Sequence, residues 1–154
     1  MFDHGALTDA LLAHLEAQVG VLLDGDALPL VGDGVAPADG GWLHGQPGDG
    51  VFRPYVVLVS SGASPRYQDL STTWPGWTVS FSLRSFAGSR RQCDWMGMLV
   101  RSAAQGFNHT SFGESEAWKV IGVEWSGLGP VSRVDATNPP FWQVFDSVSF
   151  VCGT

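Results

Sequence analysis

Hydrophobic and polar positions alternate most regularly in the stretch from Trp77 to Arg84. Apolar side chains fall on one side of this stretch, and serine, threonine and arginine fall on the other. A period of two residues is typical of a half-buried strand. The apolar members are Trp77, Val79, Phe81 and Leu83. We therefore predict a strand from Trp77 to Phe86, followed by a tight connection at Ala87 and Gly88.

A helix is predicted directly after this connection. Ser89 lies three residues before Gln92, so its hydroxyl can accept from the Gln92 amide while the Gln92 side chain returns to the Ser89 N–H. Apolar residues then recur three or four positions apart, as on the buried face of a helix: Cys93, Met96, Val100, Ala103 and Phe107. Gly106 is expected to turn left-handed and end the helix.

An earlier helix is predicted from Asp9 to Leu22, and we expect it to pack on a sheet. Thr8 is placed to cap it, and Asp9 lies in the first turn, where negative charge is favourable. Its apolar face consists of Leu11, Leu15, Val19 and Leu22.

Three further strands follow from the pattern. Tyr55 to Val59 is continuously apolar, which predicts a central strand covered on both faces. Ala117 to Trp125 alternates, with Ala117, Lys119, Ile121, Val123 and Trp125 on one side. Phe141 to Cys152 alternates as well, but Asp146 interrupts its apolar face, which favours an edge strand or a partner contact.

Two long segments lack periodicity. Residues 24–50 are rich in Gly, Asp and Pro and are predicted to form a long loop, with one short hairpin around Leu28 to Val35. Residues 60–76 join two predicted antiparallel strands and are expected to form a protruding arm.

The predicted order is helix, strand, strand, helix, strand, strand. It indicates an α+β fold: a mostly antiparallel sheet of about four strands with two helices on one face. We expect residues 1–154 to form a single domain, the default for this length.

Composition excludes several functions. The net charge is -7 with a single lysine, so no basic stripe is available to bind duplex nucleic acid tightly. No apolar run approaches the length of a membrane span and no targeting signal is visible, which predicts a protein made in a cytoplasm. The 7 tryptophans are expected to pack in the core and loops; the alternative is that some of them face a partner.

No catalytic, metal or cofactor motif is complete. Asp24 and Asp26 begin like a calcium loop, but no glutamate closes it. Cys93 near a helix N-terminus is the best hint of an enzyme, although Cys93 and Cys152 are both expected to be buried thiols. We therefore predict no catalytic residue, no metal and no cofactor.

Arg90 and Arg91 lie in the first turn of the second predicted helix, where positive charge opposes the helix dipole. One interpretation is two solvated arginines, with Arg90 paired to Asp94 four residues later. The other is a salt bridge across a subunit boundary.

Several segments together resemble a known family, the tail terminator proteins of long-tailed phages that infect actinobacteria. The resemblance is one of pattern and covers most of the chain outside residues 24–50. It rests on residues 7–12, 55–59, 81–86, 89–93, 100–104 and 142–150. It implies a virion subunit, assembled in the host cytoplasm, that forms a six-membered ring on the end of the tail tube.

The ring of such proteins stops tube polymerisation and joins the tail to the head connector or stopper, and DNA passes through its acidic channel without specific binding. On this reading Tyr67, Trp74 and Trp42 contact partners. Arg90 and Arg91 lie at a subunit boundary opposite an acid such as Asp69 or Glu114. The alternatives are another head-tail joining protein, a tail tube subunit or, more remotely, a small thiol or hydrolytic enzyme.

Overall fold

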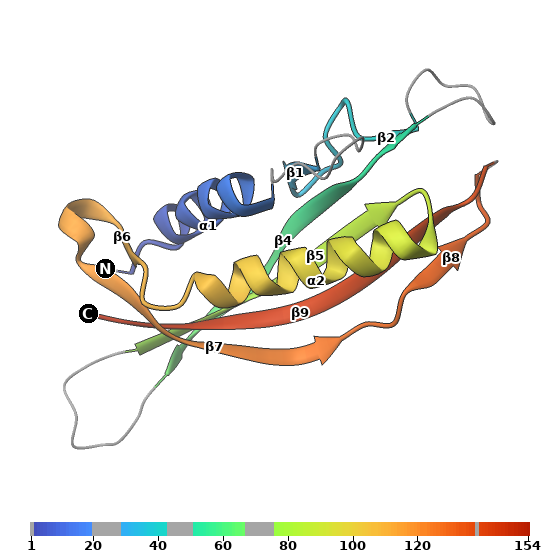
Figure 1. Ribbon diagram of the computed structural model, residues 1–154. Helices are drawn as coiled ribbons and strands as arrows, with labels where there is room; N and C mark the ends of the chain where they lie inside the picture. Colours follow the sequence, from blue (N-terminus) through green and yellow to red (C-terminus); the bar gives the residue numbers. More distant parts are fainter. Residues whose placement is uncertain (1, 20–28, 43–50, 67–75, 138) are drawn as a thin grey trace.

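The computed structural model describes residues 2–19, 29–42, 51–66, 76–137 and 139–154. Most of the secondary structure in these ranges is strand (Figure 1). The elements are α1 (His4–Val19), β1 (Leu30–Asp33), β2 (Gly41–Trp42), β3 (Phe52–Arg53), β4 (Tyr55–Arg66), β5 (Gly76–Ala87), α2 (Arg90–Gly106), β6 (Ser111–Phe112), η2 (Glu114–Glu116), β7 (Trp118–Leu128), β8 (Ser132–Val134) and β9 (Phe141–Gly153).

The predicted fold class is wrong. The described residues form a 7-stranded mixed sheet in the order β1-β4-β5-β9-β7-β6, with β8 also paired to β9, and β2 and β3 form a separate pair. The sheet curves into a half-barrel. The helices do not cover a flat sheet of four strands; they fill the inside of this curve (Figure 1). The missed strands β1, β6 and β8 are 4, 2 and 3 residues long, too short to show a period of their own.

Helix α1 begins earlier than predicted. The Asp3 carboxylate accepts from the Ala6 N–H at 2.9 Å and so caps the helix, whereas Thr8 lies inside it and donates its hydroxyl to the His4 carbonyl at 3.0 Å. The buried face repeats every four residues and consists of Leu7, Leu11, Leu15 and Val19. Leu22, predicted to belong to the same face, lies outside the described residues.

Helix α2 begins as predicted. The Ser89 hydroxyl accepts from the Gln92 N–H at 3.1 Å, while the Gln92 side chain accepts from Gly88 N–H, one residue before the expected partner, at 2.9 Å. The predicted apolar stripe from Cys93 to Phe107 is buried. The end differs: Phe107 follows in a right-handed conformation, and the left-handed residue is His109, with φ of 67°.

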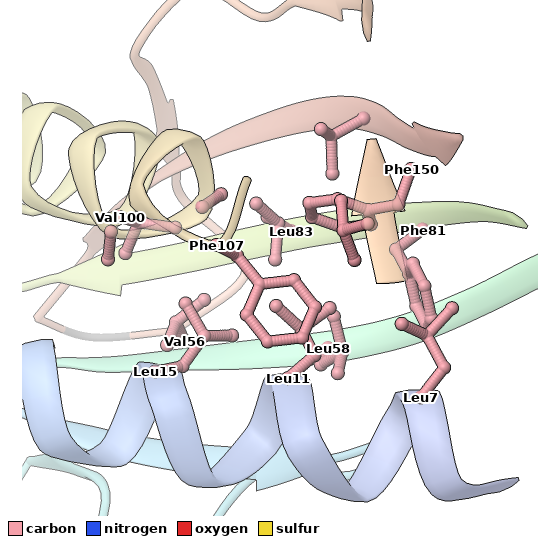
Figure 2. Close-up of a cluster of buried hydrophobic side chains, with 14 of the residues drawn as sticks. Leu7, Leu11, Leu15, Val56, Leu58, Phe81, Leu83, Val100, Phe107 and Phe150 are labelled. Carbon is pink, nitrogen blue, oxygen red and sulfur yellow. The ribbon is translucent and has the colours of Figure 1, made fainter. Parts of the chain in front are cut away.

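The main core lies between the helices and the concave side of the sheet (Figure 2). The prediction for β4 is confirmed, because Val56, Val57 and Leu58 are all buried and β4 lies between β1 and β5. Phe150 of β9 is placed edge-on against Phe81 and Phe107, with ring centroids 5.9 and 5.4 Å apart. Aromatic pairs in this geometry add to the stability gained by burial.

Two strand predictions need correction. Strand β9 is not an edge: it pairs with β5 on one side and with β7 and β8 on the other. In β7 the predicted alternation fails because the register shifts between Val120 and Gly122 and again between Trp125 and Gly127. Each extra residue of a bulge reverses the side that later residues face, so Val120 and Val123 both pack against the core although they are three residues apart, and Ile121 is 50% exposed.

The two aperiodic segments are partly ordered into strands. Within residues 24–50, β1 pairs in parallel with β4, so the expected hairpin around Leu28 to Val35 is not formed by the described residues there. At the predicted arm, Ser60 to Arg66 extends β4 and pairs with β5 up to Gly76. Residues 67–75 lie outside the described part.

Candidate subunit interface

A groove of about 450 Å³ opens beside the N-terminus of α2. It is formed by the β2–β3 pair, the turn after β5 and the first turns of α2. Its lining residues are Trp42, Val51, Phe52, Gly88, Ser89, Arg91, Gln92 and Trp95. The structure thus brings together two residues that the sequence singled out separately, Trp42 and Arg91.

Gly88 allows this close approach. A Cβ atom at residue 88 would lie 2.4 Å from the Cβ of Phe52, which is shorter than any normal contact. Phe52 in turn contacts the Trp42 ring edge-on, with centroids 5.1 Å apart. The short connection after β5 therefore holds the β2–β3 pair against the start of α2.

Trp42 carries an unsatisfied donor. Its indole Nε1 is buried and has no hydrogen-bond partner among the described residues. A buried donor without an acceptor costs about 1–3 kcal/mol.

Arg90 and Arg91 are exposed at the same end of α2. The ion pairs found within the described residues are Arg66 with Glu124, Arg101 with Asp146 and Arg133 with Asp135. The Arg90–Asp94 pair is not among them, although the exposure of both arginines agrees with the solvated interpretation. Two positive charges thus oppose the helix dipole with no acid compensating them in the described part of the chain.

The acids predicted to face these arginines are not beside them in the same chain. Glu114 is exposed in η2, which follows the far end of α2 (Figure 1). A helix of 17 residues is about 25 Å long, so Glu114 can meet these arginines only between copies displaced along the helix. Tyr67, Asp69 and Trp74 lie outside the described residues.

The other described tryptophans pack as the core interpretation predicts. Trp77, Trp95, Trp118 and Trp125 are partly buried against the main core, and Trp142 packs against a small second cluster of Ala87, Cys93 and Val144. Trp42 and Trp95 are the described tryptophans that line the groove.

Sequence reasoning missed a buried ion pair. Asp146 is 1% exposed, and its two carboxylate oxygens accept from the guanidinium of Arg101 at 2.8 and 2.9 Å. The hydrogen bond to Asp146 raises the pKa of Arg101. Arg101 also donates to the Gly129 carbonyl at 3.2 Å, and Gly129 N–H donates to Asp146 at 3.0 Å. The sequence signal for this pair was Asp146, an acid on the apolar face of a predicted strand. A carboxylate that is buried with such a face requires a partner.

The thiols lack the features of a nucleophile. Cys93 is fully buried, and its pKa is raised to about 12 by burial, assisted by the nearby charges of Asp94 and Asp146. Burial likewise raises the pKa of Cys152 to about 12. Neither sulfur is a thiolate at neutral pH, and the thiolate is the reactive form.

Two histidines with described contacts are held by the fold. His14 Nε2 lies 2.8 Å from the Ala103 carbonyl, and His4 Nε2 lies 3.1 Å from the Ser60 hydroxyl. In the described ranges, no three His, Cys, Asp or Glu side chains gather as metal ligands would.

Comparison of the sequence with protein-family models and with curated proteins finds no match. Among the described helices, none is both long and apolar enough to cross a bilayer.

Proposed function

We propose that this chain is a virion structural subunit, a tail terminator that forms a ring on the last ring of the tail tube. In this role it stops tube polymerisation and joins the tail to the head connector or stopper. The proposal combines the family resemblance of the sequence with one structural observation. That observation is the exposed pair Arg90 and Arg91 beside the groove of Trp42, a charged and aromatic surface without an acidic partner in the described chain.

The composition of this surface supports a protein contact. Arginine and tryptophan are the residues most enriched where binding energy is concentrated in protein interfaces. The exposed guanidinium groups of Arg90 and Arg91 favour a partner surface that carries carboxylates or carbonyl groups.

The acidity of the chain supports the channel role. With a net charge of -7, a ring of these subunits repels DNA on balance, and like charges offer no counterion release. DNA would thus pass the ring without specific binding. Contacts between isolated subunits can be weak, because a tube end that displays six copies of one surface raises the local concentration of subunits.

The test is a charge reversal at the groove. We expect the variant Arg90→Glu/Arg91→Glu to fold as the wild type does but to lose most of its ability to cap purified tail tubes, measured by electron microscopy of tube lengths and joined particles. The control Arg84→Glu/Arg133→Glu makes the same charge change at exposed arginines elsewhere and should cap normally. Normal capping by the groove variant would discard the proposed contact surface, and failure of the wild type to bind any tube would discard the terminator role.

A further inference from the structure

The outermost strands of the large sheet, β1 and β6, are short, so the strands beside them, β4 and β7, leave part of one edge unpaired. Strand β4 pairs with β5 from Tyr55 to Arg66, but β1 covers its other edge only from Tyr55 to Leu58. Strand β7 pairs with β9 along its length, but β6 covers its other edge only at Trp118 and Lys119. No strand among the described residues covers the rest of either edge.

The two open stretches lie at the same level of the sheet. At one end, Val59 is in register with Ser82, Ser147 and Gly127 across β5, β9 and β7. At the other end, Ser64 is in register with Thr78, Val151 and Gly122. We call residues 59–64 the β4 edge and residues 122–127 the β7 edge. They are opposite borders of one block of four strands.

Strand direction makes these borders complementary. The pairs β4–β5, β5–β9 and β9–β7 are all antiparallel, so β4 and β7 run in opposite directions. A second copy in the same orientation can place its β4 edge beside the β7 edge of the first and continue the antiparallel pattern. Such a contact joins two unlike surfaces, which is the head-to-tail type that closes into rings.

The residues at these borders do little to prevent pairing. The β4 edge reads Val-Ser-Ser-Gly-Ala-Ser and has no charge, and all of it except Val59 is exposed. Monomeric proteins usually protect such edges with charges, proline or bulges. Here Glu124 is the only charge within the two edges, and it is paired at 3.1 Å with Arg66 of the same chain. Pro65 and Arg66 follow the β4 edge.

Bulges do interrupt both edges, at the shifts between Ser60 and Gly62 and between Trp125 and Gly127. A bulge bends its strand and increases the twist, so the edges are not flat templates for unlimited stacking. The bends instead restrict pairing to a register in which the interrupted ladders fit each other.

We propose that the sheet continues from one copy of this chain to the next, with the β7 edge of one copy paired antiparallel to the β4 edge of its neighbour. The inference rests on the proposed ring and names its lateral contact. A junction of about six residues per strand is smaller than a standard stable interface. Each copy in a closed ring makes two such junctions, so the ring is held more firmly than a pair.

This arrangement also indicates which partner the groove contacts. If neighbours lie beside each other along the sheet, the N-terminus of α2 faces along the strands and not toward the lateral neighbour (Figure 1). Arg90 and Arg91 then contact a tube or connector ring stacked on this one. Reversing their charge should leave lateral pairing intact.

Cysteine pairs test the junction. Ser61→Cys is combined with Ser126→Cys, and Ala63→Cys with Glu124→Cys, in the full chain under mild oxidation. Within one chain, Arg66 of β4 reaches Glu124 of β7 at 3.1 Å, so the curved sheet brings its two borders toward each other. A disulfide closed within one chain leaves the mass of a single subunit, and non-reducing electrophoresis separates it from a ladder of linked copies. The native Cys93 and Cys152 are buried and provide no background.

We expect at least one pair to give a covalent ladder from dimer up to a closed ring, and single-cysteine variants to give no species beyond the dimer. An equivalent pair at exposed sites away from both edges, Glu16→Cys/Thr137→Cys, should give no ladder. A ring seen by native mass spectrometry without any ladder from the edge pairs would overturn the edge junction and leave the terminator role standing. A ladder that grows into open polymers would support the edge junction and contradict the closed ring. The absence of both ring and ladder, with and without purified tubes, would overturn both proposals.

Discussion

The buried pair of Arg101 and Asp146 predicts that its two halves are not equally important for stability. Asp146 is 1% exposed, whereas the Arg101 side chain is 32% exposed. Replacing Arg101 with leucine leaves a buried carboxylate that keeps one hydrogen bond, from Gly129 N–H at 3.0 Å. Replacing Asp146 with leucine leaves a guanidinium that still reaches water and the Gly129 carbonyl, while Gly129 N–H keeps its bond to Phe145 O at 2.9 Å.

The expected magnitudes follow from this asymmetry. Loss of Arg101 removes two charge-assisted hydrogen bonds from a buried acid, and breaking a buried pair in this way costs about 3–5 kcal/mol. Loss of Asp146 should cost about 1–2 kcal/mol, because the stranded group is partly solvated and the leucine adds apolar contact in the core. The double variant Arg101→Leu/Asp146→Leu should be more stable than Arg101→Leu alone.

Urea unfolding of the wild type, both single variants and the double variant measures these differences. Arg133→Leu is the control, because Arg133 and Asp135 are exposed and surface pairs contribute about 0–1 kcal/mol. The reasoning is refuted if Arg101→Leu destabilises no more than Arg133→Leu, or if Asp146→Leu is the more damaging of the two single changes.

Two further outcomes are expected. Gly88→Ala should destabilise the fold by about 1–3 kcal/mol, because its Cβ would collide with Phe52. The control Gly127→Ala, where nothing lies within 4 Å, should change the unfolding free energy little. Equal effects of the two changes in thermal melts would contradict the packing described. Burial raises the thiol pKa of Cys93 and Cys152 to about 12, compared with about 8.5 in an unfolded chain. The thiols of the unfolded chain therefore ionise first as the pH rises. The free energy of unfolding should fall above about pH 9, by ~1.4 kcal/mol per pH unit for each thiol. The variant Cys93→Ala/Cys152→Ala should flatten this decline between about pH 9 and 11, and an unchanged pH profile would show that the thiols are not responsible.

Local signals in the sequence predicted local structure well. The Ser89 cap, the buried stripe of α2 and the strand β5 depend on residues within one or two turns of each other, so the pattern was sufficient. The sheet was underestimated because β1, β6 and β8 form only when longer strands offer an edge. In β7, bulges at Ile121 and Ser126 changed the phase of the alternation, and nothing in the local pattern marks where a bulge falls.

The candidate site was predicted less completely than the local secondary structure. Trp42 and Arg91 were each identified by residue type, but their meeting depends on the close contact between Gly88 and Phe52, which joins parts of the chain far apart in sequence. Asp146 was interpreted as an edge residue because its partner, Arg101, is 45 positions away. A buried acid in an apolar strand is ambiguous until the residue that neutralises it is known.

The central claim is that this chain acts as a ring of identical subunits on a tail tube. Native mass spectrometry of the purified protein, alone and with purified tubes, tests it most directly. We expect a closed assembly of six times the 16.5 kDa subunit mass, either free or recovered from tube ends. A chain that remains a single subunit at every concentration and also in the presence of tubes would contradict the claim.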